Sequence, residues 1–121
     1  MNLLFVYGTL MSSFDTEPAQ YLRTHCHYLG EATTTGSLYL VKWEFDYPAF
    51  TTFGNNTIYG EVYQFDSPEV FGYLDEHEGS EFKKREIEIF INEKRHKANA
   101  YVFISSTECL TEIPSGNFLN L

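Results

Sequence analysis

The sequence predicts an α+β fold, in which a small mixed or antiparallel β-barrel of about six or seven strands is accompanied by two short helices. The chain contains 11 Phe, 9 Tyr and 1 Trp among 121 residues, an aromatic excess that favours strands and walled pockets over a helical bundle. Short segments of β-type composition, separated by glycine and asparagine turns, occupy most of the chain, and helical spacing occurs in two places. Because composition shows no break, residues 1–121 are expected to form one domain.

The beginning of the chain predicts a buried strand followed by a helix. Residues 2–7 (NLLFVY) form an apolar run that leads directly into a Gly-Thr pair. In the following segment Asp15 or Thr16 can act as a helix N-cap, and Pro18 suits the first turn. The helix ends at or before Gly30, and three residues recur at helical spacing along it: Ala19, Leu22 and Cys26.

The middle of the chain predicts four strands and the second helix. Residues 29–41 (LGEATTTGSLYLV) give two strands around a Thr-Gly turn, and residues 47–65 (YPAFTTFGNNTIYGEVYQF) give two more across a Gly-Asn-Asn turn. A short helix follows, with Asp66 or Ser67 as its cap, a proline in its first turn and Gly79 after its end.

The last strands form a predicted hairpin. Residues 85–92 (REIEIFIN) alternate, with three isoleucines pointing inward, and residues 99–104 (NAYVFI) supply the partner strand. The basic run KRHK at residues 94–97 is interpreted as a solvated hairpin tip, as short charge runs usually are.

Charge and composition exclude several classes of protein. With 8 basic and 17 acidic residues the net charge is -9, so the surface repels phosphate backbones and we expect no nucleic-acid partner. The apolar run at the start lacks a basic n-region and is shorter than the roughly 18–20 apolar residues of a membrane span, which predicts no membrane association. Two cysteines are too few for a disulfide framework, and we therefore expect a cytoplasmic protein.

Metal and nucleophile chemistry find little support in the sequence. His25 and His27 flank Cys26, but residues two apart on a helix point to different faces, and no other Cys/His pair has ligand spacing. The chain has no G-x-S-x-G elbow, and neither cysteine sits in a recognisable nucleophile motif. We therefore predict no metal site and no triad hydrolase.

Two other features can carry chemistry. The first strand ends in Tyr7-Gly8-Thr9-Leu10, where a tight turn would expose backbone N–H groups as a small anion-binding nest, although an ordinary strand exit would leave the same pattern. The second helix carries three carboxylates into its last turn: Asp75, Glu76 and Glu78. Each faces the negative end of the helix dipole at a cost of about 0.3–1 kcal/mol. We expect Asp75 and Glu76 to face solvent, with Glu78 placed where a side chain can turn inward.

Taken together, these motifs resemble the gamma-glutamylcyclotransferase-like family in its short bacterial and plant form. The resemblance covers nearly the whole chain and rests on six motifs in the expected order. They are Y-G-[ST]-L at residues 7–10, a Tyr-Pro-Ala element at 47–49, G-E-V-Y at 60–63, L-D-x-x-E-G at 74–79, A-[YW]-V-[YF] at 100–103 and a tail resembling I-x-x-G-[DN]-W at 113–118. Departures from the family pattern include Phe82 in place of a tyrosine and Phe118 in place of a tryptophan.

The resemblance implies a cyclotransferase that acts on a γ-glutamyl amide or amine and releases 5-oxoproline and a free amine, without metal or cofactor. It maps the catalytic acid/base onto Glu78, whose pKa we expect to be raised by the helix terminus, the nearby carboxylates and an aromatic wall. Residues 7–10 would supply N–H donors to the substrate. Three further residues are candidates for the wall that selects the γ-glutamyl portion: Tyr47, Phe82 and Tyr101.

Two readings without catalysis remain open alongside the enzyme. The same fold could serve as a non-catalytic binding module for a small anionic or γ-glutamyl ligand, which would show saturable affinity without turnover. The acidic surface could instead be an interaction domain for a basic partner, with strongly salt-dependent binding.

Overall fold

The computed structural model describes residues 2–42, 46–77 and 81–120, and these residues form six strands and two helices. The elements follow one another as β1 (Leu3–Val6), α1 (Glu17–His25), β2 (His27–Lys42), β3 (Asp46–Gln64), α2 (Glu69–His77), β4 (Phe82–Ile91), β5 (Lys94–Phe103) and β6 (Thr111–Glu112). The expected α+β class is therefore confirmed.

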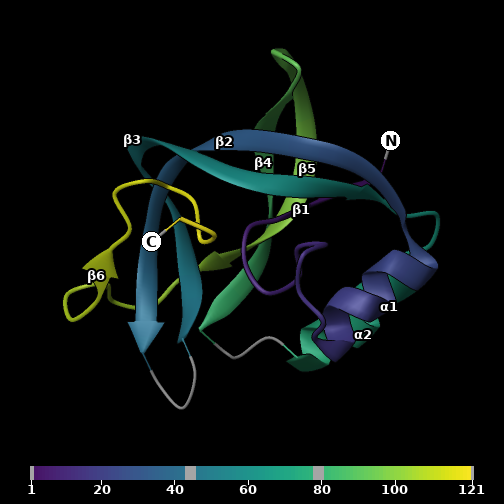
Figure 1. The fold of residues 1–121 in the computed structure, drawn as a ribbon, viewed down its shortest axis with the longest axis horizontal. Helices are drawn as coiled ribbons and strands as arrows, with labels where there is room; N and C mark the ends of the chain where they lie inside the picture. The colour runs from purple at the N-terminus through teal and green to yellow at the C-terminus, as the bar shows by residue number, and fades with distance from the viewer. Residues whose placement is uncertain (1, 43–45, 78–80, 121) are drawn as a thin grey trace.

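The strand pairings form a closed ring. β1 pairs antiparallel with β3 and parallel with β5, β5 pairs with β4, β4 with β2, and β2 returns to β3. The short strand β6 adds to β2 outside this ring. Figure 1 shows β2 and β3 as two long strands that curve together across the molecule, with the helices at one end and the C-terminal segment at the other. The parallel contact between the first and fifth strands is the link that joins the N-terminal segment to the last hairpin.

The four strands predicted in the middle of the chain are in fact two long ones, which is a correction to the sequence analysis. β2 and β3 pair along almost their whole length, and neither turns back at the expected Thr-Gly and Gly-Asn-Asn positions. The ladder instead shifts register there: Gly36 pairs with Asn56, whereas Ser37 pairs with Thr51. Four residues of β3 are thus absorbed in a bulge, and Gly54 adopts a φ of 104° within it, a conformation that glycine tolerates without strain.

The β4–β5 hairpin has the predicted alternation but a different tip. Ile87 and Ile89 are buried and the ladder runs without a register shift from Phe82 to Ile91. The turn lies at Asn92 and Glu93, whose φ values of 51° and 68° are those of a two-residue hairpin turn. Residues 94–97, expected at the tip, therefore lie on β5 itself, where most of them are exposed.

Both helices begin where the sequence indicates. Thr16 is the N-cap of α1, and its hydroxyl accepts a hydrogen bond from the backbone N–H of Ala19 (3.3 Å), with Pro18 in the first turn. This helix ends at His25, five residues before Gly30. At the start of α2 the hydroxyl of Ser67 accepts a hydrogen bond from the N–H of Glu69 (3.3 Å). The predicted C-terminal glycine of this helix, Gly79, lies outside the described residues.

Two of the three apolar clusters among the described residues meet at β1, which is buried on both faces. The first gathers inward side chains of the five ring strands, with Leu3 and Phe5 from β1. The second packs the two helices against the outer face of β1, through Leu4 and Val6. Figure 1 shows α1 and α2 side by side at this end, where the rings of Tyr21 and Tyr73 stack with centroids 3.8 Å apart. Because β1 separates the two clusters, the turn that follows it emerges between the sheet and the helices.

Candidate functional site

A cavity of about 260 Å³ lies where β1 ends. The residues that line it come from the end of β1, the turn that follows it, both helices and the strands β3, β4 and β5, with Glu81 just before β4. They are Phe5, Val6, Tyr7, Gly8, Thr9, Leu10, Pro18, Tyr47, Pro48, Leu74, Glu81, Phe82 and Tyr101. The seven residues predicted to bind substrate (Tyr7, Gly8, Thr9, Leu10, Tyr47, Phe82 and Tyr101) all belong to this list. The fold thus brings together residues 94 positions apart in the sequence, while their role in binding stays a prediction.

The floor of the cavity is a tight turn at residues 8–11. The backbone N–H of Met11 donates to the carbonyl of Gly8 (3.0 Å), which closes the turn. Gly8 is required by a close approach, because a Cβ atom built there would lie 2.4 Å from Cγ of Pro48. Among the described residues of this turn, only Met11 has a backbone N–H that donates to a backbone carbonyl. The turn can therefore direct other N–H groups toward a bound molecule.

Two buried tyrosines connect this turn to the helix layer. Tyr7, which is 7% exposed, donates its phenol O–H to the backbone carbonyl of Tyr101. Tyr101, which is 5% exposed, in turn donates its own O–H to the carboxylate of Asp75 at 2.6 Å. The carboxylate fixes the direction of a phenol that lines the cavity. Asp75 is exposed, as expected, but its carboxylate also accepts this bond from the cavity-lining Tyr101.

One side of the cavity is an aromatic wall. The rings of Tyr47 and Phe82 lie 6.2 Å apart, and Phe82 packs edge-on against Phe103 at 5.3 Å. Burial, followed by the nearby Glu81 carboxylate, raises the pKa of Tyr47. The wall thus presents apolar faces together with a phenol hydroxyl.

The charge around the cavity is negative. Glu81 contributes a carboxylate to the lining, and Asp75 adds another through Tyr101. Among the described lining residues there is no lysine or arginine. Lys84, which follows the wall residue Phe82, instead places its ammonium over the ring of Phe71 at 3.8 Å. Any anionic group of a ligand would therefore depend on backbone N–H donors in this part of the site.

The predicted catalytic residue, Glu78, lies outside the described residues. Leu74 and Glu81, four positions before it and three after it, both line the cavity. Its role and its raised pKa consequently stay predictions.

Sequence reasoning did not assign to the site Asp75, which accepts the bond from Tyr101, or six of the lining residues: Phe5, Val6, Pro18, Pro48, Leu74 and Glu81. Pro48 stands in the quoted Tyr-Pro-Ala motif, and its contact with Gly8 is a pairing between two motifs that no local pattern shows. Asp75 carried a signal, since it is one of the carboxylates in the last turn of the helix that the sequence predicts.

Other kinds of site find no support in the described residues. No group of three or more His, Cys, Asp or Glu side chains there is placed to hold a metal ion. Nor is any helix in that part of the chain both long and apolar enough to cross a membrane.

Comparison with known proteins identifies the class of this fold and site. The profile of the family described as "Gamma-glutamyl cyclotransferase, AIG2-like" matches residues 4–120. The chain belongs to this family. No protein of curated function matches the sequence significantly.

Several solved structures share this fold. The uncharacterized protein PH0828 from Pyrococcus horikoshii is 26% identical, with a TM-score of 0.72 over 98% of this chain and 90% of that one. Protein ytfP from Escherichia coli is 25% identical, with a TM-score of 0.71 over 98% and 96%. An AIG2-like protein from Mus musculus superposes with a TM-score of 0.76 over 95% and 87%, and at 22% identity this likeness concerns the fold alone.

Proposed function

We propose that the protein is a cyclotransferase that converts a γ-glutamyl amide or amine into 5-oxoproline and a free amine. The observation that carries the proposal is the gathering of the motif residues from β1, β3, β4 and β5 around one cavity in a member of this family. The cavity volume of about 260 Å³ suits a small molecule better than a polymer.

The reaction needs correct folding of the substrate more than a reactive protein group. The α-amino nitrogen attacks the γ-carbonyl carbon, a five-membered lactam forms, and the bond to the leaving nitrogen breaks. Overall two protons pass from the attacking ammonium to the leaving nitrogen, and no water is consumed. Holding the chain in the folded geometry can supply up to about 7–11 kcal/mol of the barrier, because the attack is intramolecular.

Glu78 is the proposed general acid and base. A single carboxylate can take the proton from the attacking ammonium and return it to the departing nitrogen. Its placement in the sequence between Leu74 and Glu81, both of which line the cavity, supports this assignment. The role would also account for a carboxylate in the last turn of the helix that the sequence predicts, where the dipole disfavours it.

The turn at residues 8–11 is the proposed holder of negative charge on the substrate. Its N–H groups would donate to the substrate carboxylate or to the oxyanion that develops on the γ-carbonyl oxygen. Tyr101, whose phenol donates to Asp75, lines the cavity and is a proposed contact of the substrate. Tyr47 and Phe82 would enclose the methylene groups.

The test is 5-oxoproline release from a panel of γ-glutamyl amino acids and γ-glutamyl amines. Glu78→Gln should lower kcat by about 10²–10⁴ because it removes the proton carrier. Glu76→Gln, the same substitution at an exposed position of α2, is the control and should keep wild-type activity.

Two results would contradict the proposal. A folded wild type that turns over no member of the panel would favour the binding module, which a saturable affinity for the same compounds would identify. Full activity in Glu78→Gln would contradict the role of Glu78 as general acid and base, but not the cyclotransferase activity itself.

A further inference from the structure

The loop at residues 8–16 (the 8–16 loop), whose first three residues line the cavity, is held mainly by side chains. Its backbone closes two successive turns, through Met11 N–H to the Gly8 carbonyl and Phe14 N–H to the Met11 carbonyl, each at 3.0 Å. The hydroxyl of Thr16 donates to the carbonyl of Thr9 at 2.9 Å and so ties the N-cap of α1 to the turn. Further hydrogen bonds to the loop come from the side chains of Glu61, Arg23 and Gln20.

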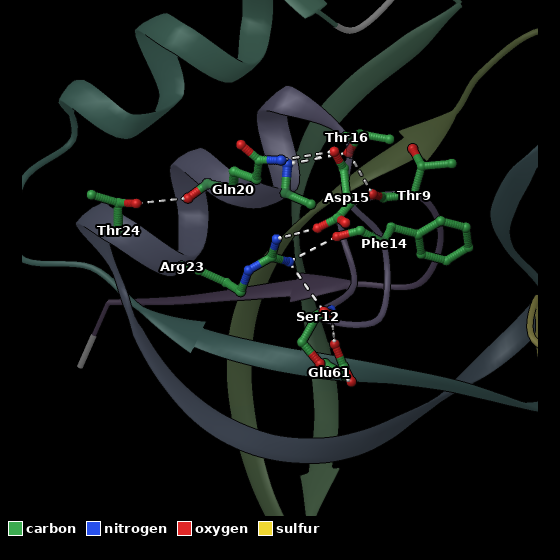
Figure 2. A network of polar contacts seen from close by, with 10 residues as sticks. Thr9, Ser12, Phe14, Asp15, Thr16, Gln20, Arg23, Thr24 and Glu61 are labelled. Atoms are coloured by element: carbon green, nitrogen blue, oxygen red, sulfur yellow. Dashed lines mark hydrogen bonds and ion pairs between the residues drawn. The ribbon is translucent and has the colours of Figure 1, made fainter.

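Glu61 holds the loop through hydrogen bonds to Ser12. It lies on β3 directly opposite Val6, the last residue of β1, and is therefore adjacent to the point where the chain leaves the sheet. One carboxylate oxygen accepts the backbone N–H of Ser12 at 2.6 Å, and the other accepts its hydroxyl at 2.9 Å. The second oxygen also lies 3.3 Å from the hydroxyl of Tyr28, which donates to it. Figure 2 shows the Glu61 carboxylate pointing at Ser12 from the sheet below the loop.

Arg23, on α1, holds the same segment through hydrogen bonds and an ion pair. Its guanidinium donates to the carbonyl oxygens of Ser12 (3.1 Å) and Phe14 (2.8 Å), and it pairs with the Asp15 carboxylate at 3.3 Å. In Figure 2, Ser12 is held between Arg23 and Glu61, which come from α1 and β3. The residue immediately after the 8–11 turn is thus fixed by a charged group on each side.

The position of Glu61 carries an electrostatic cost that its contacts offset. Glu61 pairs directly with Glu31 across the β2–β3 ladder, and like charges at opposed positions are destabilising. Glu31 is exposed, and its carboxylate makes no hydrogen bond or ion pair within the described residues. Glu61 is half-buried, and its two bonds to Ser12 are charge-assisted, which makes them the stronger class of hydrogen bond.

We propose that Glu61 is a positioning residue for the reaction proposed above: by holding Ser12 it fixes the 8–11 turn, and with it the direction of the N–H groups that bind the substrate. This inference rests on the proposed function. Donors to a developing oxyanion act over about 2.7–3.1 Å, so a small displacement of the turn is sufficient to weaken them. Glu61 itself makes no contact with the substrate, since the cavity lining does not include it.

The experiment compares three variants for turnover and for amide hydrogen exchange by NMR. Glu61→Ala removes both acceptors and should lower kcat by about 10- to 100-fold, the effect expected of a misplaced reacting geometry. Glu61→Gln should retain most of the activity, because its amide oxygen can accept the Ser12 N–H while its NH₂ donates to the Ser12 hydroxyl. Glu31→Ala removes an equal charge at the opposed position and should leave kcat unchanged.

The exchange measurement tests the inference without any turnover. Glu61→Ala should accelerate exchange at residues 9–12, and Glu61→Gln and Glu31→Ala should not. If the wild type is inactive on every γ-glutamyl compound, the proposed function fails, and exchange alone then decides whether Glu61 holds the turn. Equal exchange at residues 9–12 in Glu61→Ala and Glu31→Ala would overturn the inference, as would equal loss of kcat in Glu61→Ala and Glu61→Gln.

Discussion

The β4–β5 hairpin and the 8–16 loop hold their backbones in different ways. In the hairpin, ten consecutive residue pairs follow one register, and the two ion pairs on its surface, Arg95–Glu88 (3.4 Å) and Lys97–Glu86 (3.9 Å), are well exposed. In the loop, two turn bonds are supplemented by contacts from Glu61 and Arg23. Backbone pairing determines the shape of the first region, whereas individual side chains determine that of the second.

The comparison has a consequence for the location of function. A ladder fixes its geometry whatever the exposed side chains are, so the hairpin tolerates change on its surface. A loop held by side chains can leave backbone N–H groups unpaired and available to a ligand, which a strand ladder does not. Each side chain that holds the loop is then necessary for its shape. We therefore expect substitutions of similar size to have unequal effects in the two regions.

The largest effect should come from crowding the turn. Gly8→Ala places a Cβ atom 2.4 Å from Cγ and 2.9 Å from Cδ of Pro48, so the turn and the strand carrying Pro48 must separate. We expect a loss of about 1–3 kcal/mol in the free energy of unfolding, together with lost turnover. Urea denaturation followed by circular dichroism measures the first, and 5-oxoproline release the second.

Gly72→Ala is the matched control for this change. A Cβ atom at Gly72 would meet nothing within 4 Å, and the residue lies in α2. Alanine there should stabilise the protein by about 0.5–1 kcal/mol, since it lowers the entropy that the helix loses on folding. Equal stability of the Gly8 variant and the wild type would show that the turn is not confined by Pro48.

A smaller difference should separate two arginines. Arg23→Ala removes donors to two loop carbonyls and should cost about 1.5 kcal/mol, as for hydrogen bonds from charged groups. Arg95→Ala removes one exposed ion pair of the hairpin and should change stability by no more than about 0.5 kcal/mol. Unfolding in urea at low and high salt measures both. A cost for Arg95→Ala that matches Arg23→Ala would contradict the contrast between the two regions.

The third prediction concerns Tyr63, which lies on β3 beside the loop. Its side chain is fully buried, and its hydroxyl has no hydrogen-bond partner within the described residues. Burial, followed by the Glu61 carboxylate, raises the pKa of Tyr63 to about 12. The pKa in the folded protein exceeds the ordinary value of 10. The protonated phenol therefore contributes its full stabilisation of the folded state below pH 10, and this contribution is lost as the pH rises toward 12.

The measurement is the free energy of unfolding at pH 9 and pH 11. At pH 11 the wild type should have lost about 1.4 kcal/mol through this group, and Tyr63→Phe should not show that part of the loss. Tyr59→Phe, at a position on the same strand that is 45% exposed, is the control and should behave as the wild type. Identical alkaline profiles for Tyr63→Phe and the wild type would contradict the raised pKa.

The sequence by itself determined the local elements. Thr16 caps α1 because its hydroxyl reaches a free N–H of the first turn, and this needs no distant residue. Ile87 and Ile89 point inward because side chains alternate along a strand. The motif residues of the site could be named for the same reason, since each stands in a short pattern that resembles the family.

Only the tertiary structure decided which of the local turn sequences form turns and which distant residues the site residues contact. The Thr-Gly and Gly-Asn-Asn segments could each make a turn, but pairing along the whole of β2 and β3 turned them into a bulge, because continuous hydrogen bonding outweighs a local turn preference. The contacts of Gly8 with Pro48, Tyr101 with Asp75 and Ser12 with Glu61 join residues 26 to 49 positions apart. Such contacts depend on how the strands close into a ring, and no periodicity in the sequence encodes that closure.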